Sequence, residues 1–117
     1  MDDQLKQLFD YTKFHIGMYT SLIAAIIGVF ANDTLKDQYC GMVLYIKCSV
    51  ALFVLAGMAG GLIASSIPFF TSFDAFRAAR LGPWHLKLVP AVWCTHIEHT
   101  AFWLGCLCAV AGLMAVL

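Results

Sequence analysis

The sequence predicts an all-α membrane protein with three transmembrane helices, and its composition is the first reason. Of its 117 residues, 62% are hydrophobic and 12% are charged, against ~45–50% and ~25% in an ordinary soluble domain. A soluble protein of this size could not cover so much apolar surface with so few charges. The composition therefore excludes a disordered chain, a secreted disulfide scaffold and a general nucleic-acid-binding domain.

Long stretches without charge are the second reason. The chain has 19 uncharged residues between Lys13 and Asp33 and 26 between Lys47 and Asp74. No charged residue follows Glu98. A helix of ~19–20 residues covers ~30 Å, the thickness of the hydrocarbon core. These stretches do not alternate apolar and polar residues, as the strands of a membrane barrel would. We expect one transmembrane domain, residues 1–117, with spans at about 14–32, 43–67 and 99–117.

The segment between the second and third spans, residues 68–98, is too polar to face lipid. The spacing of Thr71 and Asp74 resembles a capping box, and Gly82–Pro83 is a stop signal, so a short helix is expected over residues 72–81. We expect the first helix to cover residues 4–31, with Asp2 or Asp3 as its cap, and the last helix to run from Pro90 to Leu117.

Basic residues predict the orientation of the chain. Loops on the cytoplasmic side carry an excess of Lys and Arg. Two lysines precede the first span, and Arg77, Arg80 and Lys87 lie between the second and third, whereas the first loop holds only Lys36 between two acidic residues. We therefore expect a cytoplasmic N-terminus and 68–98 segment, with the C-terminus outside.

Small residues recur along the spans at alternating steps of four and three. The first span has Gly17, Ser21, Ala24, Gly28 and Ala31, the last has Ala101, Gly105, Cys108, Gly112 and Ala115, and the middle one has Gly57, Gly61 and Ala64. In lipid, helices associate by close backbone approach at such residues. We expect a homo-oligomer in which one of these seams faces a neighbouring subunit, and its candidate glycines are Gly17, Gly28, Gly57, Gly61, Gly105 and Gly112. The alternative is that all three seams meet inside one protomer.

Lys47 is a charged residue where the second span enters the membrane. Its stem can extend to the outer headgroups between Tyr39 and Tyr45 as interface anchors. Alternatively, an oligomer would place a ring of Lys47 side chains at the outer mouth of a pore, favouring anions or repelling cations.

The 68–98 segment holds the candidate ligand site. Phe73, Arg77 and Arg80 share one side of the expected short helix, and Trp84 and Lys87 follow. Guanidinium groups bind phosphate oxygens and aromatic faces stack on bases, so this set can hold an anionic planar ligand. The alternative is that these cations anchor the segment to anionic lipid.

Histidines near the third span allow a metal or haem alternative. His96 and His99 are one turn apart and could reach one metal ion, with His85 or His15 as a third ligand, whereas Cys94 and Glu98 fall on a different side of the helix. His15 is expected at the depth of His96 or His99, which would permit a bis-His haem. Hydrogen-bonded interface histidines are the simpler interpretation, so no metal or cofactor is expected. The five cysteines are expected to be free thiols.

These features favour a homo-oligomeric channel or pore in the lipid bilayer, gated from the cytoplasm through the 68–98 segment. The alternatives are a haem- or quinone-binding anchor subunit of a redox complex, and an accessory structural subunit. An enzyme is not expected, because Ser65–Ser66 and Thr71–Ser72 lack a positioned base.

The length, three spans, small mass outside the membrane and short basic segment together resemble the small multi-span membrane effectors of bacterial anti-phage defence systems. The resemblance is of architecture over the whole chain, rests on no sequence motif and transfers no site residues. It implies an oligomer in a bacterial inner membrane that responds to a nucleotide signal. An oligonucleotide or cyclic nucleotide, and no duplex nucleic acid, would then be the ligand of the Arg77, Arg80 and Trp84 segment.

Overall fold

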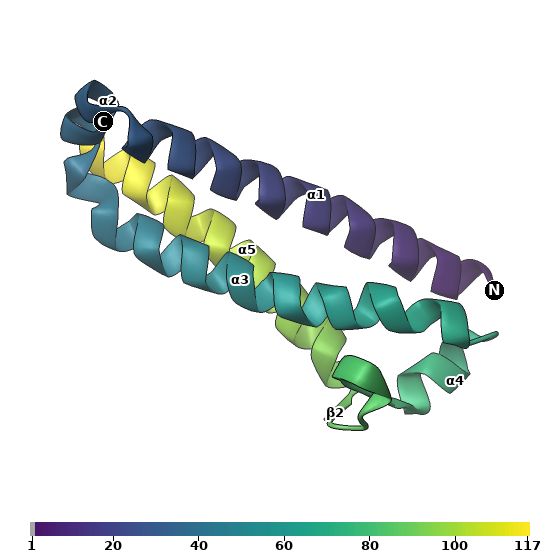
Figure 1. Cartoon of the computed structure of the whole chain (residues 1–117). Helices are drawn as coiled ribbons and strands as arrows, with labels where there is room; N and C mark the ends of the chain where they lie inside the picture. The colour runs from purple at the N-terminus through teal and green to yellow at the C-terminus, as the bar shows by residue number, and fades with distance from the viewer. Residues whose placement is uncertain (1) are drawn as a thin grey trace.

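The computed structural model describes residues 2–117, and three long helices dominate it (Figure 1). They are α1 (Asp3–Ala31), α3 (Val43–Ser66) and α5 (Ala91–Val116). Each is long and apolar enough to cross a membrane by length and composition. The all-α prediction is therefore confirmed, and the three helices are compatible with an integral membrane protein. The expected extents of the first and last helices are confirmed to within a residue or two.

Short elements connect the long helices. Between α1 and α3 lie α2 (Asp33–Gln38) and the 3-10 turn η1 (Cys40–Met42). Between α3 and α5 lie η2 (Ile67–Phe69), α4 (Phe73–Ala78), β1 (Arg80–Leu81), η3 (Pro83–His85) and β2 (Val89–Pro90). Strands β1 and β2 pair antiparallel, with Arg80 opposite Pro90 and Leu81 opposite Val89. We call residues 80–90 the hairpin.

The helix expected over residues 72–81 is shorter than predicted. Ala79 already has extended backbone, with φ −84° and ψ 164°, and the next two residues pair with β2. Pairing in the hairpin therefore ends α4 before the Gly82–Pro83 stop signal is reached. The start also differs by one residue, because Ser72 rather than Thr71 caps the helix, accepting a hydrogen bond from the Ala75 N–H.

Two helix caps fix the ends of α1. The carboxylate of Asp2 accepts a hydrogen bond of 2.8 Å from the Leu5 N–H, so Asp2 is the predicted N-cap. At the other end, the side chain of Asn32 accepts from the Leu35 N–H and starts α2 where α1 stops. Such caps satisfy N–H groups that the first turn of a helix leaves unpaired.

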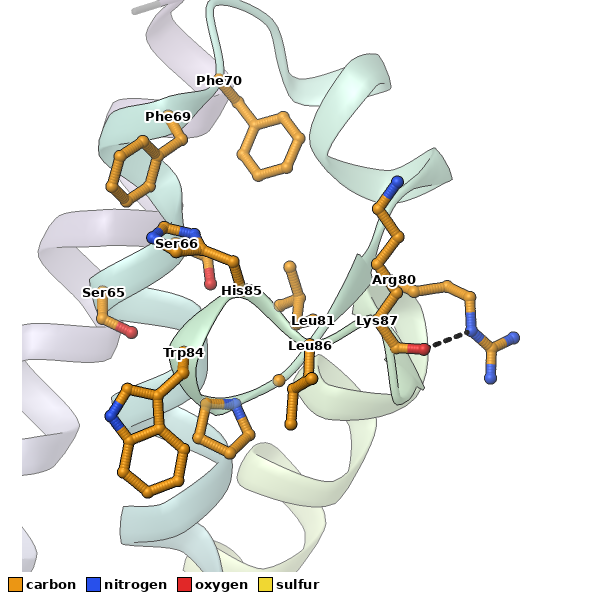
Figure 2. Close-up of a pocket in the computed structure, with 12 residues that line it drawn as sticks. Ser65, Ser66, Phe69, Phe70, Arg80, Leu81, Trp84, His85, Leu86 and Lys87 are labelled. Carbon is orange, nitrogen blue, oxygen red and sulfur yellow. Dashed lines mark hydrogen bonds between the residues drawn. The ribbon is translucent and has the colours of Figure 1, made fainter.

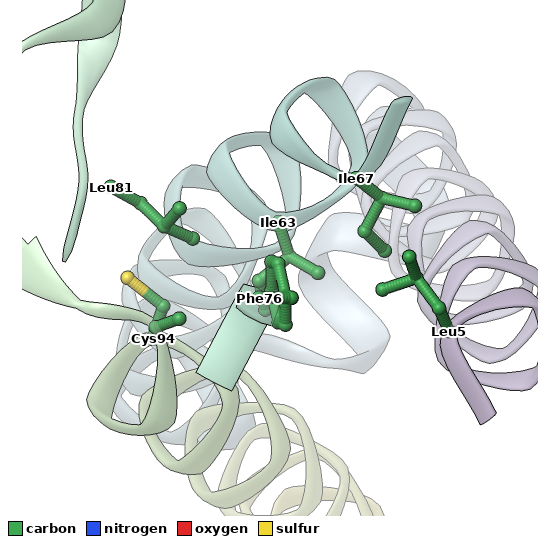
Figure 3. Packing of buried hydrophobic residues seen from close by; sticks show 7 residues of the cluster. Leu5, Ile63, Ile67, Phe76, Leu81 and Cys94 are labelled. Carbon is green, nitrogen blue, oxygen red and sulfur yellow. The ribbon is translucent and has the colours of Figure 1, made fainter. Parts of the chain in front are cut away.

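Helices α3 and α5 pack closely along their length, whereas α1 lies beside the pair and touches mainly α3 (Figure 1). Buried apolar side chains form two clusters. One lies at the α4 end of the bundle and joins all the long helices (Figure 3), with Leu5, Ile63, Ile67, Phe76, Leu81 and Cys94 among its members. The other lies midway along the bundle and includes Tyr19, Phe53, Ala56, Ala101 and Phe102.

Candidate functional site

The five residues of the expected ligand site do not form one cluster. Phe73 and Arg77 lie on α4 and pair with each other, the Arg77 guanidinium carbon being 5.7 Å from the centre of the Phe73 ring. Both line a small cavity of about 130 Å³ beside Leu8 of α1 and Val92 of α5. Arg80, Trp84 and Lys87 instead line a larger cavity against the end of α3. The early end of α4 is what separates the two groups.

The larger cavity, of about 400 Å³, lies between the hairpin and the residues Ser65, Ser66, Phe69 and Phe70 (Figure 2). Figure 2 shows Trp84 and His85 on the side of the serines, while the guanidinium of Arg80 extends to the other side. That guanidinium donates hydrogen bonds to the carbonyls of Lys87, at 3.4 Å, and Leu88, at 2.7 Å. Arg80 therefore braces the hairpin and has only part of its donor set left for a ligand.

The tip of the hairpin has an unusual backbone. Trp84 and His85 have φ values of 53° and 64°, in the left-handed region that side chains other than glycine rarely adopt. The preceding Gly82 is required, because a Cβ there would collide with the Leu86 carbonyl. The tip thereby holds the Trp84 side chain outward, 89% exposed. Such a ring can anchor at a membrane interface or stack on a ligand.

Asp2 links this segment to α1. One oxygen of its carboxylate caps α1, and the other accepts a hydrogen bond of 2.6 Å from the Phe73 N–H at the start of α4. The N–H groups of Phe73 and, to a smaller extent, Leu5 hold the pKa of the Asp2 carboxyl below its usual value. The carboxylate thus connects the first turns of two helices that are far apart in the sequence.

Lys47 lies on an exposed part of α3, towards the end of the bundle that holds α2. Tyr39, before the start of α3, is half-buried, and Tyr45 is 40% exposed. This arrangement agrees with both interpretations of Lys47, as a residue that reaches the headgroups and as a residue at the mouth of an oligomeric pore.

In the row of small residues on α5, Gly105 and Gly112 face α3 within the same chain, whereas Ala115 is exposed. A Cβ added at Gly105 would lie 2.7 Å from a ring carbon of Phe53, and one at Gly112 would lie 2.7 Å from Cβ of Tyr45. The Ser49 hydroxyl donates a hydrogen bond of 2.8 Å to the Gly105 carbonyl. We call this row the α5 stripe, defined as Ala101, Gly105, Cys108, Gly112 and Ala115.

The small residues of α1 all lie on its outer side. Each member of this row, the α1 stripe, is exposed: Gly17, Ser21, Ala24, Gly28 and Ala31. A Cβ added at Gly17 or Gly28 would meet no atom of residues 2–117 within 4 Å, apart from the adjacent residues and the nearby backbone of α1 itself. The same is true at Gly61 of α3, whereas a Cβ at Gly57 would touch the ring of Tyr19.

A group of three ionisable side chains joins α1 to α5. Nδ1 of His15 lies 2.8 Å from Oε1 of Glu98, in a hydrogen bond, and Nδ1 of His99 lies 2.8 Å from Oε2 of the same carboxylate. Glu98 is fully buried and His15 is 1% exposed. We call these three residues the His–Glu–His cluster. Ionisable groups at such a position in apolar helices are costly and mark functional sites.

The aromatic neighbours of the cluster fix its histidine rings. The His15 ring stacks on Phe102, with centroids 4.1 Å apart, and Tyr11 covers both His15 and His99. The aliphatic chain of Glu98 lies beside Gly60, where an added Cβ would be 3.4 Å from its Cγ. The cluster is therefore held between all three long helices.

Sequence reasoning found only part of this cluster. The similar depth of His15 and His99 was expected, and their ring centroids lie 5.4 Å apart. His96, the predicted partner of His99, instead packs near Trp93 on another face of α5. Helical spacing predicted that Glu98 lies with Cys94 on a different side of α5 from the histidines, whereas in the structure its carboxylate contacts both His15 and His99. Adjacent residues on a helix point about 100° apart, yet Glu98 and His99 both reach His15 because α1 lies between their two directions.

Comparisons of this chain with protein-family models, with curated protein sequences and with solved structures find no match.

Proposed function

We propose that the protein is a homo-oligomeric membrane channel that assembles through the α1 stripe and is controlled from the hairpin end. The observation that carries this proposal is the exposure of the whole α1 stripe in a chain whose α5 stripe is already packed at Gly105 and Gly112. Exposed small residues leave a groove of about 480 Å³ along α1, beside Gly17 and Ser21. A helix of a second copy is the occupant that such a groove suits, because small residues allow close backbone approach in lipid.

The groove needs no polar partner from outside. The Ser21 hydroxyl already donates a hydrogen bond of 2.8 Å to the Gly17 carbonyl. A hydroxyl satisfied in this way does not have to be paired by a neighbouring helix. Packing alone can therefore drive association at this surface.

The interior of one copy is filled by aromatic side chains, which supports a conduction path between copies. Phe53 and Phe102 are 0% and 1% exposed, and Tyr19 packs against both. A path between copies would be lined by exposed faces of the long helices, which include Lys47 on α3. Gating by dewetting of an apolar constriction is a known mechanism for such pores.

Control from the hairpin end would use the connection between α4 and α1. Helix α4 and the hairpin together connect α3 to α5, and the Asp2 carboxylate joins α4 to the helix that carries the α1 stripe. An anionic ligand at Lys87, Trp84 and His85 would shift the hairpin and, through α4, the packing of α1. In this proposal the N-terminus and residues 68–98 face the cytoplasm of a bacterial inner membrane, and the ligand is a nucleotide.

The redox-anchor alternative receives less support from the geometry. A bis-His haem needs a macrocycle between the two imidazoles, and in this chain the Glu98 carboxylate bridges His15 and His99. We therefore put the channel ahead of a haem-binding anchor.

Ion flux through liposomes tests the proposal. We expect the purified wild-type protein to pass ions and the double variant Gly17→Leu/Gly28→Leu to lose that flux, because a leucine would fill the groove at Gly17 and a second one would block the α1 stripe at Gly28. Gly61→Leu is the matched control, since Gly61 is also open but lies outside the α1 stripe. A wild-type protein that passes no ions, or a double variant that conducts normally, would refute the proposal.

A further inference from the structure

We propose that His15, Glu98 and His99 bind a divalent transition-metal cation of the Zn²⁺ type between α1 and α5. Two imidazole nitrogens and one carboxylate oxygen form a ligand set that zinc takes in many proteins, with one coordination position left open. The site would lie at the junction of the three long helices. This proposal concerns a ligand of the single chain, so it does not depend on channel assembly.

The distances between the donor atoms suit one shared ion. One ring nitrogen of each histidine and one carboxylate oxygen of Glu98 all lie within 4.8 Å of one another. Two ligands of a tetrahedral zinc ion lie about 3.3 Å apart, given bonds of ~2.0–2.1 Å. Small side-chain rotations would therefore bring all three donors to bonding distance, without a change in the backbone.

The hydrogen bonding within the cluster is incomplete. Oε2 of Glu98 and Nδ1 of His99 are 2.8 Å apart, yet both are buried atoms without a hydrogen-bond partner in the described chain. The two atoms are close enough for a hydrogen bond, but their geometry does not form one. An unpaired buried carboxylate oxygen costs free energy, and a cation that both atoms face would remove that cost.

The neighbouring side chains suit a metal site in two further ways. The Tyr19 hydroxyl, one turn after His15, and the Thr12 hydroxyl, one turn before it, are both buried without a hydrogen-bond partner. Such groups can pair with water or a ligand in the outer shell of an ion. His99 is 34% exposed in its side chain, so an ion has a route to the cluster from the surface.

A bound cation would have a structural consequence. Helix α1 touches α3 more than α5, and the cluster is a polar link from α1 to α5. An ion that binds the folded chain and not the unfolded one raises stability by mass action. We therefore expect metal to hold α1, the helix with the α1 stripe, against the α3–α5 pair.

The test uses the full-length, tag-free protein in detergent, stripped with a chelator and then titrated with Zn²⁺ and with Co²⁺ as a spectroscopic probe. We expect one ion per chain, a Co²⁺ spectrum of nitrogen and oxygen ligation without a thiolate band, and a higher Tm with metal. Glu98→Gln and His99→Asn should each weaken binding by more than ~100-fold, since each removes one of three ligands.

His96→Asn is the matched control, because His96 lies on the same helix and outside the cluster. It should bind metal as the wild type does. The Tm of each variant without metal shows whether the variant is folded. His99→Asn should disturb packing least, because the His99 side chain is half-exposed. The proposal is overturned if the stripped wild type takes up no ion, if folded His99→Asn binds as tightly as wild type, or if His96→Asn loses binding.

Discussion

Two helices of this protein carry the same spacing of small residues and use it in different ways. In α5, Gly105 and Gly112 face α3 so closely that an added Cβ would lie 2.7 Å from a neighbouring side-chain atom. In α1, Gly17 and Gly28 have open space outside them. The spacing therefore predicts a groove on each helix, but it does not predict which partner fills that groove.

The two stripes differ because large side chains of the same chain lie opposite Gly105 and Gly112 of α5, and none among residues 2–117 lies opposite Gly17 and Gly28 of α1. Phe53 and Tyr45 of α3 pack against Gly105 and Gly112 of the α5 stripe, and α3 packs more extensively against α5 than against α1. Helix α1 turns its other side to the pair, with His15 and Tyr19 buried on it. Its small residues consequently remain on the outside, where a second copy can reach them.

The largest expected effect is that of Gly105→Leu. A side chain at this position would overlap Phe53, which is fully buried, and would push α3 and α5 apart. Overpacking of this kind costs ~1–3 kcal/mol and sometimes more. We expect a large fall in the Tm of the detergent-solubilised protein. An unchanged Tm would show that Gly105 is not in a tight interface.

Ser49→Ala should have a smaller effect at the same interface. The change removes the buried hydrogen bond from the Ser49 hydroxyl to the Gly105 carbonyl, and such a bond is worth about 0.6–1.5 kcal/mol. Thermal unfolding should detect this loss, while Ser65→Ala, at an exposed hydroxyl bonded within its own helix, serves as the control. Equal effects of the two changes would count against a specific role for Ser49.

Asp2 should make the contact between α1 and α4 depend on pH. Because its pKa is lowered in the folded protein from an ordinary value of 3.8, its contribution to stability is present above that value. It is lost as the pH falls through the lowered pKa. The protection of the Phe73 N–H against hydrogen exchange, measured as the intrinsic rate divided by the observed rate at the same pH, should therefore fall in acid. In Asp2→Asn this protection should already be lower at neutral pH. A wild-type exchange rate in the variant would contradict the link.

Gly28→Leu should have the smallest effect on the stability of one chain. The leucine would extend into open space. The free energy of unfolding of the dilute, dissociated protein should therefore stay within about 0.5 kcal/mol of wild type, and its Tm should hardly change. Replacing glycine inside a helix can even stabilise it slightly. A destabilisation as large as that of Gly105→Leu would mean that the two stripes do not differ as described.

The sequence was sufficient to predict the three long helices, because uncharged stretches and caps such as Asp2 are local signals. The end of α4 could not be predicted, because it depends on pairing between Arg80–Leu81 and Val89–Pro90. The ligand residues were grouped on the assumption of a continuous helix, so the early end of α4 separated Arg77 from Arg80. The contact of Glu98 with His15 depends on how α1 and α5 pack, and the spacing of residues within one helix gives no information on that packing.

The mass of the protein in detergent, measured by native mass spectrometry, tests the difference between the two stripes most directly. We predict a defined homo-oligomer for the wild type and for Gly61→Leu, and a folded monomer for Gly17→Leu/Gly28→Leu. A wild-type protein that is monomeric, or a double variant that keeps the wild-type mass, would contradict assembly through α1.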